Sequence, residues 1–584
     1  MFVLYYRVFM KDKIKGLDII IGFLFIVVLT ILISVYAPYR IGFKEQVSVF
    51  FWNSERISWY LYNPGVLACV IGDWLTQFYL VNSIGIALTI LLSILSWLGI
   101  VRVIYLSGGR QGIFSAAMFP VVIVGAFMVW PHYPVSALVG FLLSIWASCL
   151  LSHLAKPEIR ALVMCFGIPV MFIMVGGNAI LFAVVSCFLK NGKIKVNLIA
   201  LIVGLLLMFI VSHYYNLTLK ESLIFPVIPG YVPKNWVLLL LPLSVVVVLT
   251  ISLLNKNLYI SIVCAIGSIC IFSTSFKDSI IEFTVKIGSL AYNSDWEEVR
   301  NEANKNSDSL FGLYYRNLSY AREGRLPDAL LDCNQSPYLD GFFLYTPSKI
   351  DDFPIKFFSS YYYCDALLEM GDLSDAIDCA LFGQSCTPGG YSSRLLRRLA
   401  EISVTAGDYE VANKYLNILS RTHNYHDWAR DLLYCVEIDS IPEKYLILRS
   451  RTSRTDSFFA LGGIHAALNA IIVDNPMNKV AADYLMCSFL LKNDIQTFVN
   501  LYDKYWLNGL DRYYNIPKIY QEALLLNVDS DESLKEIVQK YRLSPQIVEN
   551  YLNFNEGYFN TDSDAGWIRE FKDTYWHYLM TAHK

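Results

Sequence analysis

The chain has 584 residues, of which 55% are hydrophobic and only 17% charged, a composition typical of membrane proteins rather than of one soluble globule. Residues 1–275 hold 17 Lys and Arg and 7 Asp and Glu, a net charge of +10. Subtraction from the totals of 47 and 50 leaves 30 and 43 for residues 276–584, a net charge of −13. An acidic second part argues against nucleic acid as a partner. The sequence therefore predicts a transmembrane helical domain over 1–275 and a soluble domain over 276–584.

The first part is a series of apolar runs separated by charges, Pro or Gly. Residues 17–37 form the first run, which is long enough to cross a bilayer and longer than the core of a signal peptide, so we expect it to be retained. About nine spans are predicted in total, at 17–37, 83–106, 113–130, 135–153, 159–175, 177–189, 196–212, 236–254 and 258–275. The short sixth run leaves open whether the pair around Gly176-Gly177-Asn178 is one bent hairpin or two crossings.

Lys and Arg are distributed unevenly over the connecting segments. With a cytoplasmic N-terminus, the inner segments carry 12 of the 17 and the outer segments carry 5. Basic residues favour the cytoplasmic side, so this asymmetry supports that orientation. Nine crossings would then place the C-terminal domain in the periplasm, with the chain in a bacterial inner membrane; a miscount of one span would reverse the side. The first outer loop, 38–82, is rich in Trp, Tyr and Phe, which predicts a segment lying at the outer membrane interface.

Helical hairpins with a turn glycine recur in the second part. Three of them pair a glycine with an alanine five residues later, and a degenerate fourth has Asn493 at the turn: Gly324 with Ala329, Gly371 with Ala376, and Gly407 with Ala412. The glycine suits a left-handed turn that ends the first helix, and the alanine permits close helix packing. The turns are 47, 36 and 86 residues apart. An all-α fold is therefore predicted, with a tetratricopeptide-like α-solenoid that has irregular insertions.

Scattered motifs along the chain resemble a family of bacterial multi-pass membrane proteins of unknown function with C-terminal tetratricopeptide-like repeats. The motifs are Pro64-Gly65, Leu75-Thr76-Gln77-Phe78-Tyr79, Ala406-Gly407-Asp408-Tyr409-Glu410 with Ala412 and Tyr415-Leu416, Asn475-Pro476 with Asn478-Lys479, Tyr484-Leu485-Met486, Tyr520-Gln521-Glu522-Ala523-Leu524-Leu525-Leu526 and Asp573-Thr574-Tyr575-Trp576. Val66 stands where a second glycine is expected. The resemblance implies the two-part architecture and no particular activity.

One acidic residue suggests an enzymatic alternative. Asp73 lies in the long first outer loop, where membrane glycosyltransferases that use polyprenyl-phosphate sugars place a carboxylate as base or metal ligand. Arg56, His132 and Glu221 are the further candidate catalytic residues on this hypothesis. The alternative for Asp73 is a cap on a short interfacial helix, and for His132 an interfacial hydrogen-bonding residue.

Other classes of site have little support in the sequence. The twelve cysteines include no C-x-x-C pair, so we expect no metal site and no cofactor, while a disulfide among the six C-terminal cysteines stays open. Transporters usually carry ionisable residues at mid-membrane, and no run of these is found. We find no phosphate-binding loop and no nucleophile elbow.

The favoured interpretation is a non-enzymatic inner-membrane scaffold. It would contact membrane lipid through its spans and bind another envelope protein or a glycan through its periplasmic repeats. The candidate partner-binding residues are the tyrosines Tyr361, Tyr362, Tyr363, Tyr513 and Tyr514, because tyrosine is common at interfaces. Tyrosine is also common in the cores of helical repeats, so these residues have a structural alternative.

Overall fold

The structure is a computed structural model that describes residues 16–109, 112–154, 156–189, 194–215, 217–227, 240–254, 279–336, 338–339, 341–344, 353–453, 463–560 and 570–582. Helices dominate these residues, and no extended strand occurs among them, which confirms the all-α fold class. The chain divides into two compact units. The first comprises Met1–Val285, Cys386–Arg394 and Ile418–Asp427, and the second comprises Lys286–Ser385, Leu395–Asn417 and Trp428–Lys584.

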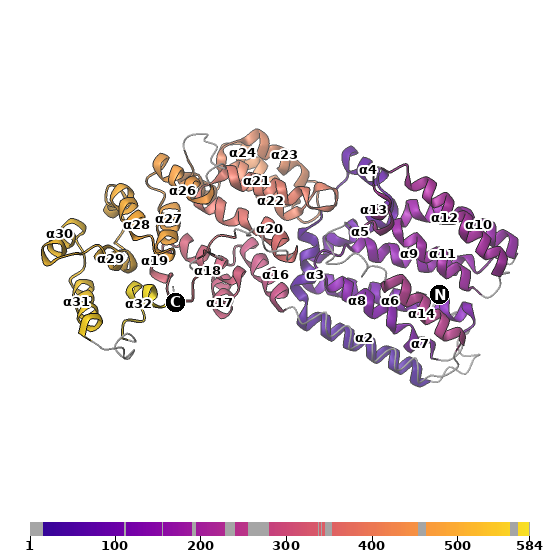
Figure 1. Ribbon diagram of the computed structural model, residues 1–584. Coiled ribbons are helices and arrows are strands. Elements are labelled where there is room, and N and C mark those ends of the chain that lie inside the picture. The colour runs from indigo at the N-terminus through magenta and orange to yellow at the C-terminus, as the bar shows by residue number, and fades with distance from the viewer. Residues whose placement is uncertain are drawn as a thin grey trace. The chain divides into compact units, whose positions relative to one another are not determined.

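The first unit is a bundle of apolar helices (Figure 1). Its elements are α2 (Gly16–Tyr36), α3 (Pro38–Gln46), α4 (Ser54–Leu61), α5 (Val66–Thr76), η1 (Gln77–Leu80), α6 (Asn82–Ser107), α7 (Ile113–Ala116), α8 (Met118–Val129), α9 (Val135–Leu151), α10 (Pro157–Val175), η2 (Gly176–Asn178), α11 (Ala179–Phe188), α12 (Ile194–Ser212), α13 (Leu219–Ile224) and α14 (Leu240–Leu254). The next helix, α16 (Ser279–Tyr292), begins in the first unit and ends in the second.

Four helices in the described part of the chain are long and apolar enough to cross a membrane: Asp18–Tyr36, Asn82–Ser107, Pro157–Phe188 and Lys195–Ser212. Nine spans are therefore not found among the residues that the structure describes. Helix α9 has 17 residues, or about 26 Å, which falls short of a bilayer core of about 30 Å. The run at 113–130 is divided between α7 and α8, and the run at 258–275 lies outside the described residues. The fifth and sixth runs merge into the segment Pro157–Phe188, which bends at Gly176, where φ is +66°.

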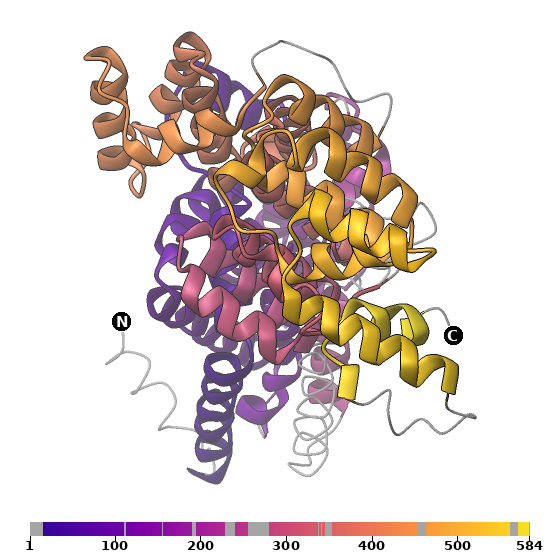
Figure 2. The same cartoon turned by 90° about the vertical axis from the view of Figure 1, so that its left-hand side faces the viewer.

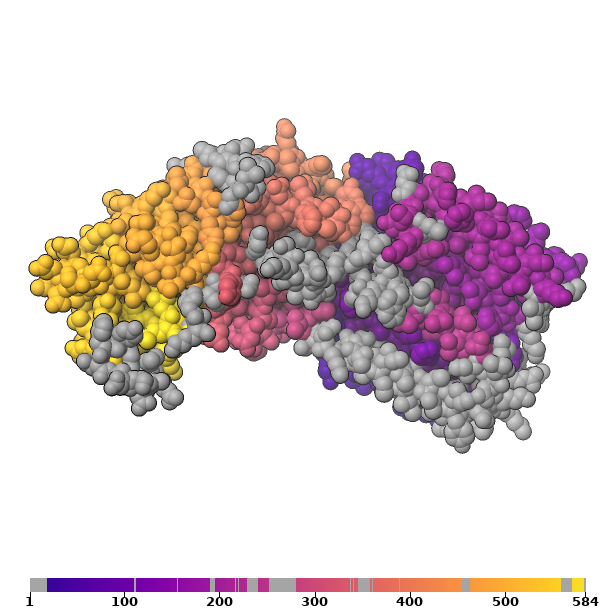
Figure 3. Space-filling view, viewed as in Figure 1, coloured from indigo at the N-terminus to yellow at the C-terminus, as the bar shows by residue number. Residues whose placement is uncertain are grey.

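Helices α2, α10 and α12 keep broad apolar faces outside the core of the first unit. Figures 1 and 2 show α2 as one straight helix at the edge of this unit. Its side chains Phe23 and Val35 are more than 60% exposed. The atoms of α10 and α12 form a continuous outer surface in Figure 3. Leu162 of α10 and Ile210 of α12 are exposed. Water disfavours apolar surface of this extent, whereas lipid tails cover it without cost.

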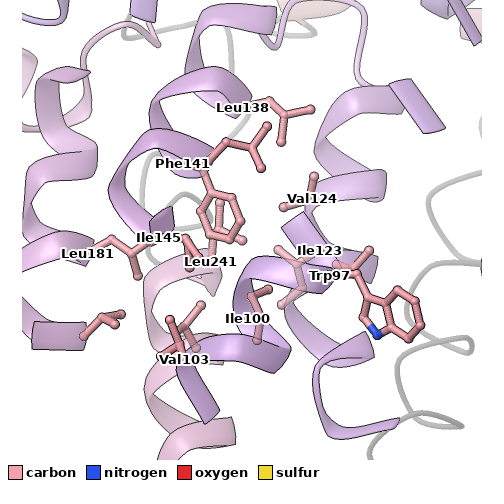
Figure 4. Close-up of a cluster of buried hydrophobic side chains, with 14 of the residues drawn as sticks. Trp97, Ile100, Val103, Ile123, Val124, Leu138, Phe141, Ile145, Leu181 and Leu241 are labelled. Carbon is pink, nitrogen blue, oxygen red and sulfur yellow. The ribbon is translucent and has the colours of Figure 1, made fainter. Parts of the chain in front are cut away.

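The core of the first unit fills the space between α6, α8, α9, α11 and α14. Figure 4 shows its labelled side chains converging from these five helices: Trp97, Ile100, Val103, Ile123, Val124, Leu138, Phe141, Ile145, Leu181 and Leu241. Small residues set how closely the helices approach. A Cβ atom added at Gly72 of α5 would lie 2.4 Å from the backbone of Ser136 at the start of α9. This close crossing fixes α5, and with it Asp73, against the bundle.

The segment 38–82, predicted to be the first outer loop, is itself helical. Residues Arg40 to Gln46 of α3 are all buried, so this short helix lies inside the unit. Large side chains in the rest of the segment are exposed, among them Trp52, Tyr62 and Trp74. The loop thus combines an embedded polar helix with an aromatic outer surface.

The second unit consists of shorter amphipathic helices (Figure 1). They are α17 (Trp296–Lys305), α18 (Leu310–Arg322), α19 (Leu326–Ala329), α20 (Phe353–Met370), α21 (Leu373–Ser385), η4 (Pro388–Gly390), α22 (Ser393–Ala406), α23 (Tyr409–Leu419), α24 (His426–Glu437), α25 (Glu443–Arg451), α26 (Gly463–Asp474), α27 (Lys479–Leu491), α28 (Ile495–Leu501), η6 (Tyr502–Trp506), η7 (Leu510–Arg512), α29 (Lys518–Leu525), α30 (Asp531–Tyr541), α31 (Pro545–Asn560) and α32 (Tyr575–Ala582). Of these, η4 and parts of α22, α23 and α24 belong to the first unit.

The predicted hairpin turns are found. Gly324, Gly371 and Gly407 have φ values of +70°, +85° and +85°, and Asn493 has φ +60°. Each residue follows the end of one helix and precedes the next, in the left-handed conformation that glycine and asparagine adopt most readily. The alanines paired with the three glycines are buried, at 4% exposure or less.

A simple stack of neighbouring repeats does not describe how the hairpins pack. Helix α18 contacts α27, and α19 contacts both α27 and α29, although these helices lie at least 150 positions apart in the chain. The last helix, α32, returns to pack on α29. A regular solenoid brings only adjacent repeats together, so this unit departs from the predicted arrangement. In the sequence, the irregular spacing of the turns is the feature that agrees with this departure from a regular solenoid.

Residues of the family-like motifs form a polar core between α27, α29 and α32. The hydroxyl of Tyr520 donates to Asp483 at 2.9 Å, and Lys479 also pairs with Asp483. The carboxylate of Glu522 accepts the backbone N–H of Tyr575 at 2.8 Å. Burial raises the pKa of Asp483 to about 6 and that of Glu522 to about 7. These hydrogen bonds join α27, α29 and α32. They require two carboxyl groups to be buried, which costs desolvation free energy.

Because these two pKa values are raised, we expect the protein to become less stable as the pH increases. The folded chain binds protons more tightly than the unfolded chain, whose carboxyl pKa values are about 4. Stability therefore falls as the pH rises from about 4 to about 7, by a few kcal/mol in total. Thermal unfolding followed by circular dichroism between pH 5 and 8 measures this slope. The variant Glu522→Gln, which keeps the hydrogen bond from Tyr575 without a charge, should flatten the slope; an unchanged slope would contradict the assignment.

Candidate functional site

Helices α4 and α5 bring Arg56 and Asp73 together. Asn53 caps α4 by accepting the backbone N–H of Arg56, and Gly65, in a left-handed conformation, starts α5. The guanidinium of Arg56 donates to Asp73 Oδ2 at 2.7 Å, and the hydroxyl of Tyr60 donates to the same oxygen at 2.9 Å. Two of the four predicted catalytic candidates are therefore joined in one ion pair.

Aromatic rings surround the guanidinium of Arg56. It lies 4.6 Å from the ring centre of Trp59, 5.0 Å from that of Tyr60 and 5.8 Å from that of Tyr391. The Arg56 side chain is 1% exposed and the Asp73 side chain 16%. Burial raises the pKa of Asp73, whereas Arg56 and the Tyr60 hydroxyl oppose this change. The arrangement is that of a structural ion pair: the two charges are paired with each other and largely shielded from solvent, although Arg56 Nη1 has no hydrogen-bond partner among the described residues.

One of the two interpretations of the sequence made Asp73 a helix cap, and the structure contradicts it. It lies inside α5, eight residues after its N-cap, Gly65. A capping aspartate accepts a backbone N–H at the helix start, whereas the contacts of Asp73 here are with side chains.

A small pocket lies beside Asp73, with Glu45 also in its wall. The hydroxyl of Tyr425 donates to Glu45 Oε2 at 3.1 Å, and the side-chain amide of Asn424 donates to the backbone oxygen of Gln77 at 2.8 Å. The pocket encloses about 10 Å³, the room that one water molecule needs. Binding sites for small molecules have volumes of about 300–1,000 Å³. The pocket is thus too small for a sugar.

His132 lies apart from this ion pair, next to α3. It is buried, and its ring packs edge-on against Phe43. Burial, together with the neighbouring charge of Lys44, lowers the pKa of His132 to about 3. Lys44 donates to the backbone oxygens of Trp130 and Tyr133. His132 is consequently neutral at physiological pH and packs in the interior, which differs from the interfacial hydrogen-bonding residue of the alternative interpretation.

Glu221 has a local structural role. Its carboxylate accepts the backbone N–H and the hydroxyl of Thr218, and its own N–H donates to that hydroxyl, which completes a capping box at the start of α13. These hydrogen bonds lower the pKa of Glu221. A larger pocket of about 110 Å³ lies between α9, α11, α13 and α14, and its lining includes none of the four candidates.

The predicted partner-binding tyrosines divide into two groups. Tyr361 and Tyr362 are fully buried, and Tyr362 stacks on Phe358 with ring centres 5.8 Å apart, so these two side chains belong to the core of the second unit. Tyr513 and Tyr514 are 67% and 41% exposed. Tyr363 is half-buried on the same helix as the first pair.

Two further features bear on the chemistry available. The ten cysteines in the described part of the chain are free thiols. No group of three or more His, Cys, Asp or Glu that could hold a metal ion occurs among the described residues. The sequence did not identify Glu45, Tyr60 and Tyr425 as neighbours of Asp73. For Tyr60 alone there was a signal, because it lies one helical turn after Arg56 on the short helix that precedes Asp73.

The fold and the site define a class of all-helical protein with apolar helices long enough to cross a membrane and a second unit of helical hairpins. Asp73, the predicted catalytic carboxylate, forms a structural ion pair with Arg56. The chain belongs to DUF6057, a family of unknown function whose model matches residues 13–582. Neither a curated protein nor a solved structure matches the chain.

Proposed function

We propose that this protein is a non-catalytic membrane scaffold whose second unit binds another protein of the cell envelope. The observation that carries the proposal is the state of Asp73. Its carboxylate is engaged by Arg56 and Tyr60, and the adjoining pocket has room for one water molecule. A glycosyltransferase that uses a lipid-linked sugar needs this carboxylate to face a substrate-sized space.

Membrane attachment in this proposal comes from the first unit. The four apolar helices with exposed faces would contact lipid, and the distribution of Lys and Arg favours a cytoplasmic N-terminus in a bacterial inner membrane. The second unit, with its tetratricopeptide-like hairpins, would then face the periplasm. Protease added to spheroplasts should cleave the second unit; cleavage only in inside-out vesicles would reverse the orientation.

A comparison of two variants tests the scaffold against the enzyme. Asp73→Asn removes the charge that a base or metal ligand requires, at a cost of about 10²-fold or more in the rate of an enzyme. A chain that ends after residue 285 lacks the second unit, together with the segments Cys386–Arg394 and Ile418–Asp427 of the first. In a strain without the gene, we expect Asp73→Asn, compared at equal membrane abundance, to restore the wild-type phenotype and the shortened chain to fail. Loss of function in Asp73→Asn, with a dispensable second unit, would establish the glycosyltransferase alternative.

A further inference from the structure

Cationic side chains from three helices of the second unit meet around acidic residues of α20. Arg322, at the end of α18, and Arg451, at the end of α25, both contact Glu369. Each takes one of its two carboxylate oxygens, with Arg451 Nη1 at 2.6 Å from Oε2. A single carboxylate is thus shared between two guanidinium groups.

The same pattern continues one turn away on α20 and α22. Arg398 donates to Asp365 and to Glu401, each at 2.7 Å. The other carboxylate oxygen of Glu401, Oε1, lies 3.7 Å from Lys444 of α25 and 3.4 Å from Arg397. We call Arg322, Arg398, Lys444 and Arg451 the cationic cluster.

Positive charge exceeds negative charge in this region. The four members of the cationic cluster share three carboxylates: Asp365, Glu369 and Glu401. Arg449, two residues before Arg451, contributes a fifth cation, which donates hydrogen bonds to the backbone oxygens of Val404 and Thr405 and to the hydroxyl of Tyr409. Arg397, which contacts Glu401, is a sixth cation, so the local balance is six minus three, or +3, within a part of the chain whose net charge is −13.

The pKa values of Arg322 and Lys444 are lowered, whereas, against the effect of burial, Asp365 and Glu401 raise the pKa of Arg398. Burial lowers the pKa of Arg322 to about 10, and the charges of Arg451 and Arg398 add to this effect. Burial also lowers the pKa of Lys444, with Arg397 and Arg398 acting in the same direction and Glu401 against it. An additional anion would relieve the repulsion between these cations.

The cationic cluster reaches solvent and is held in place. Exposure of the side chains is 56% for Lys444, 33% for Arg322 and 19% for Arg451. The guanidinium of Arg322 lies 4.2 Å from the ring centre of Trp296, which restricts its rotamers. A side chain that is already fixed loses less entropy when it binds a ligand.

Carboxylates suit this surface better than a long polyanion does. Guanidinium groups match the planar carboxylate, and the cationic cluster already holds three carboxylates in this way. The surrounding part of the chain is acidic and would repel an extended polyanion, but not a short acidic segment confined to the cationic cluster. Charge complementarity of this local kind gives specificity to protein–protein contacts.

We infer that the cationic cluster is the docking surface for a short acidic segment of the protein's partner. The inference rests on the proposed function, because it names the chemistry by which the second unit would recognise that partner. Glu or Asp side chains of the segment would pair with Arg322, Lys444 and Arg451 at their exposed sides.

Fluorescence anisotropy with the purified full-length chain in zwitterionic nanodiscs tests the inference. The probe is a labelled decapeptide of alternating Glu and Gly, compared with its Gln and Gly counterpart. We expect the acidic peptide to bind preferentially, and more weakly at high salt because ions screen exposed charges. Arg322→Gln and Lys444→Gln should each weaken binding about tenfold. Arg322→Gln leaves Glu369 paired with Arg451, and Lys444 is half-exposed, so the fold should persist in both.

The matched control is Arg430→Gln, which removes the same charge from an exposed position on α24. It should leave binding within about twofold of the wild type, as expected for a charge outside the interface. Three results would overturn the inference: equal binding of the two peptides, equal weakening by Arg430→Gln, or a clear preference for inorganic polyphosphate. If the peptide fails while the chain shortened at residue 285 still loses function, the scaffold proposal stands and the acidic partner alone is rejected.

Discussion

Replacing Arg56 by methionine is expected to reduce the free energy of unfolding of the first unit by about 3–5 kcal/mol, the usual cost of removing one partner from a buried ion pair. The change leaves the carboxylate of Asp73 with the hydroxyl of Tyr60 as its remaining side-chain donor in the described structure. It also removes the stacking of the guanidinium on Trp59 and Tyr60. Thermal unfolding of the detergent-solubilised chain, followed by tryptophan fluorescence, measures the loss.

A double-mutant cycle provides the control for this prediction. Asp73→Leu alone leaves a buried guanidinium and should also be strongly destabilising, whereas Arg56→Met combined with Asp73→Leu should recover much of the stability, since neither charge is then left alone. Additive losses in the double variant would show that the two residues act independently. That result would remove the structural role assigned to the pair and reopen a catalytic role for Asp73.

Gly371→Ala is expected to be the most damaging of the alanine substitutions at the hairpin turns. Gly371 and Gly407 share a φ of +85°, so alanine at either position incurs the left-handed penalty of about 1–2 kcal/mol. Their surroundings differ. A Cβ atom at Gly371 would lie 2.3 Å from the backbone oxygen of Arg451, whereas one at Gly407 would lie 3.7 Å from the nearest atom of Arg449.

The backbone must therefore move in one variant and not in the other. The side-chain amide of Asn478 donates to the backbone oxygens of both Met370 and Arg451 at 2.7 Å, so the movement would also strain these hydrogen bonds. We expect Gly371→Ala to cost about 2 kcal/mol more than Gly407→Ala, as overpacking against rigid backbone does. Denaturant unfolding of the two variants under identical conditions measures the difference. Equal losses would show that the turn conformation alone, and not the contact with α25, makes glycine necessary.

The hairpin turns could be read from the sequence because their cause is local. A left-handed residue between two amphipathic helices requires glycine or asparagine, whatever the rest of the chain does, and Gly324, Gly371, Gly407 and Asn493 all have positive φ. The all-α class follows from the same local periodicity. Apolar runs such as 17–37 and 83–106 likewise identify membrane-length helices from composition alone.

The number of membrane-length helices could not be read from local sequence in the same way. Hydropathy averages composition over a window and does not record where a helix stops, so the division of the run at 113–130 between α7 and α8 was not visible. In the same way, the tyrosine-rich segment of α20 suggested a binding face, yet Tyr361 and Tyr362 are buried because other helices cover them. Burial depends on which helices pack against a residue, and the neighbouring residues in the sequence do not determine this.

The candidate site shows the same division. The sequence determined that Asp73 and Arg56 lie in one polar, aromatic segment between apolar helices, because composition is a property of the segment itself. Only the tertiary structure decided that the two charges neutralise each other, and that Tyr425, 380 residues after Glu45, donates to its carboxylate beside them. The physical reason is that a charge is catalytic or structural according to its partners in space and the room left for water, and the folded chain alone sets both.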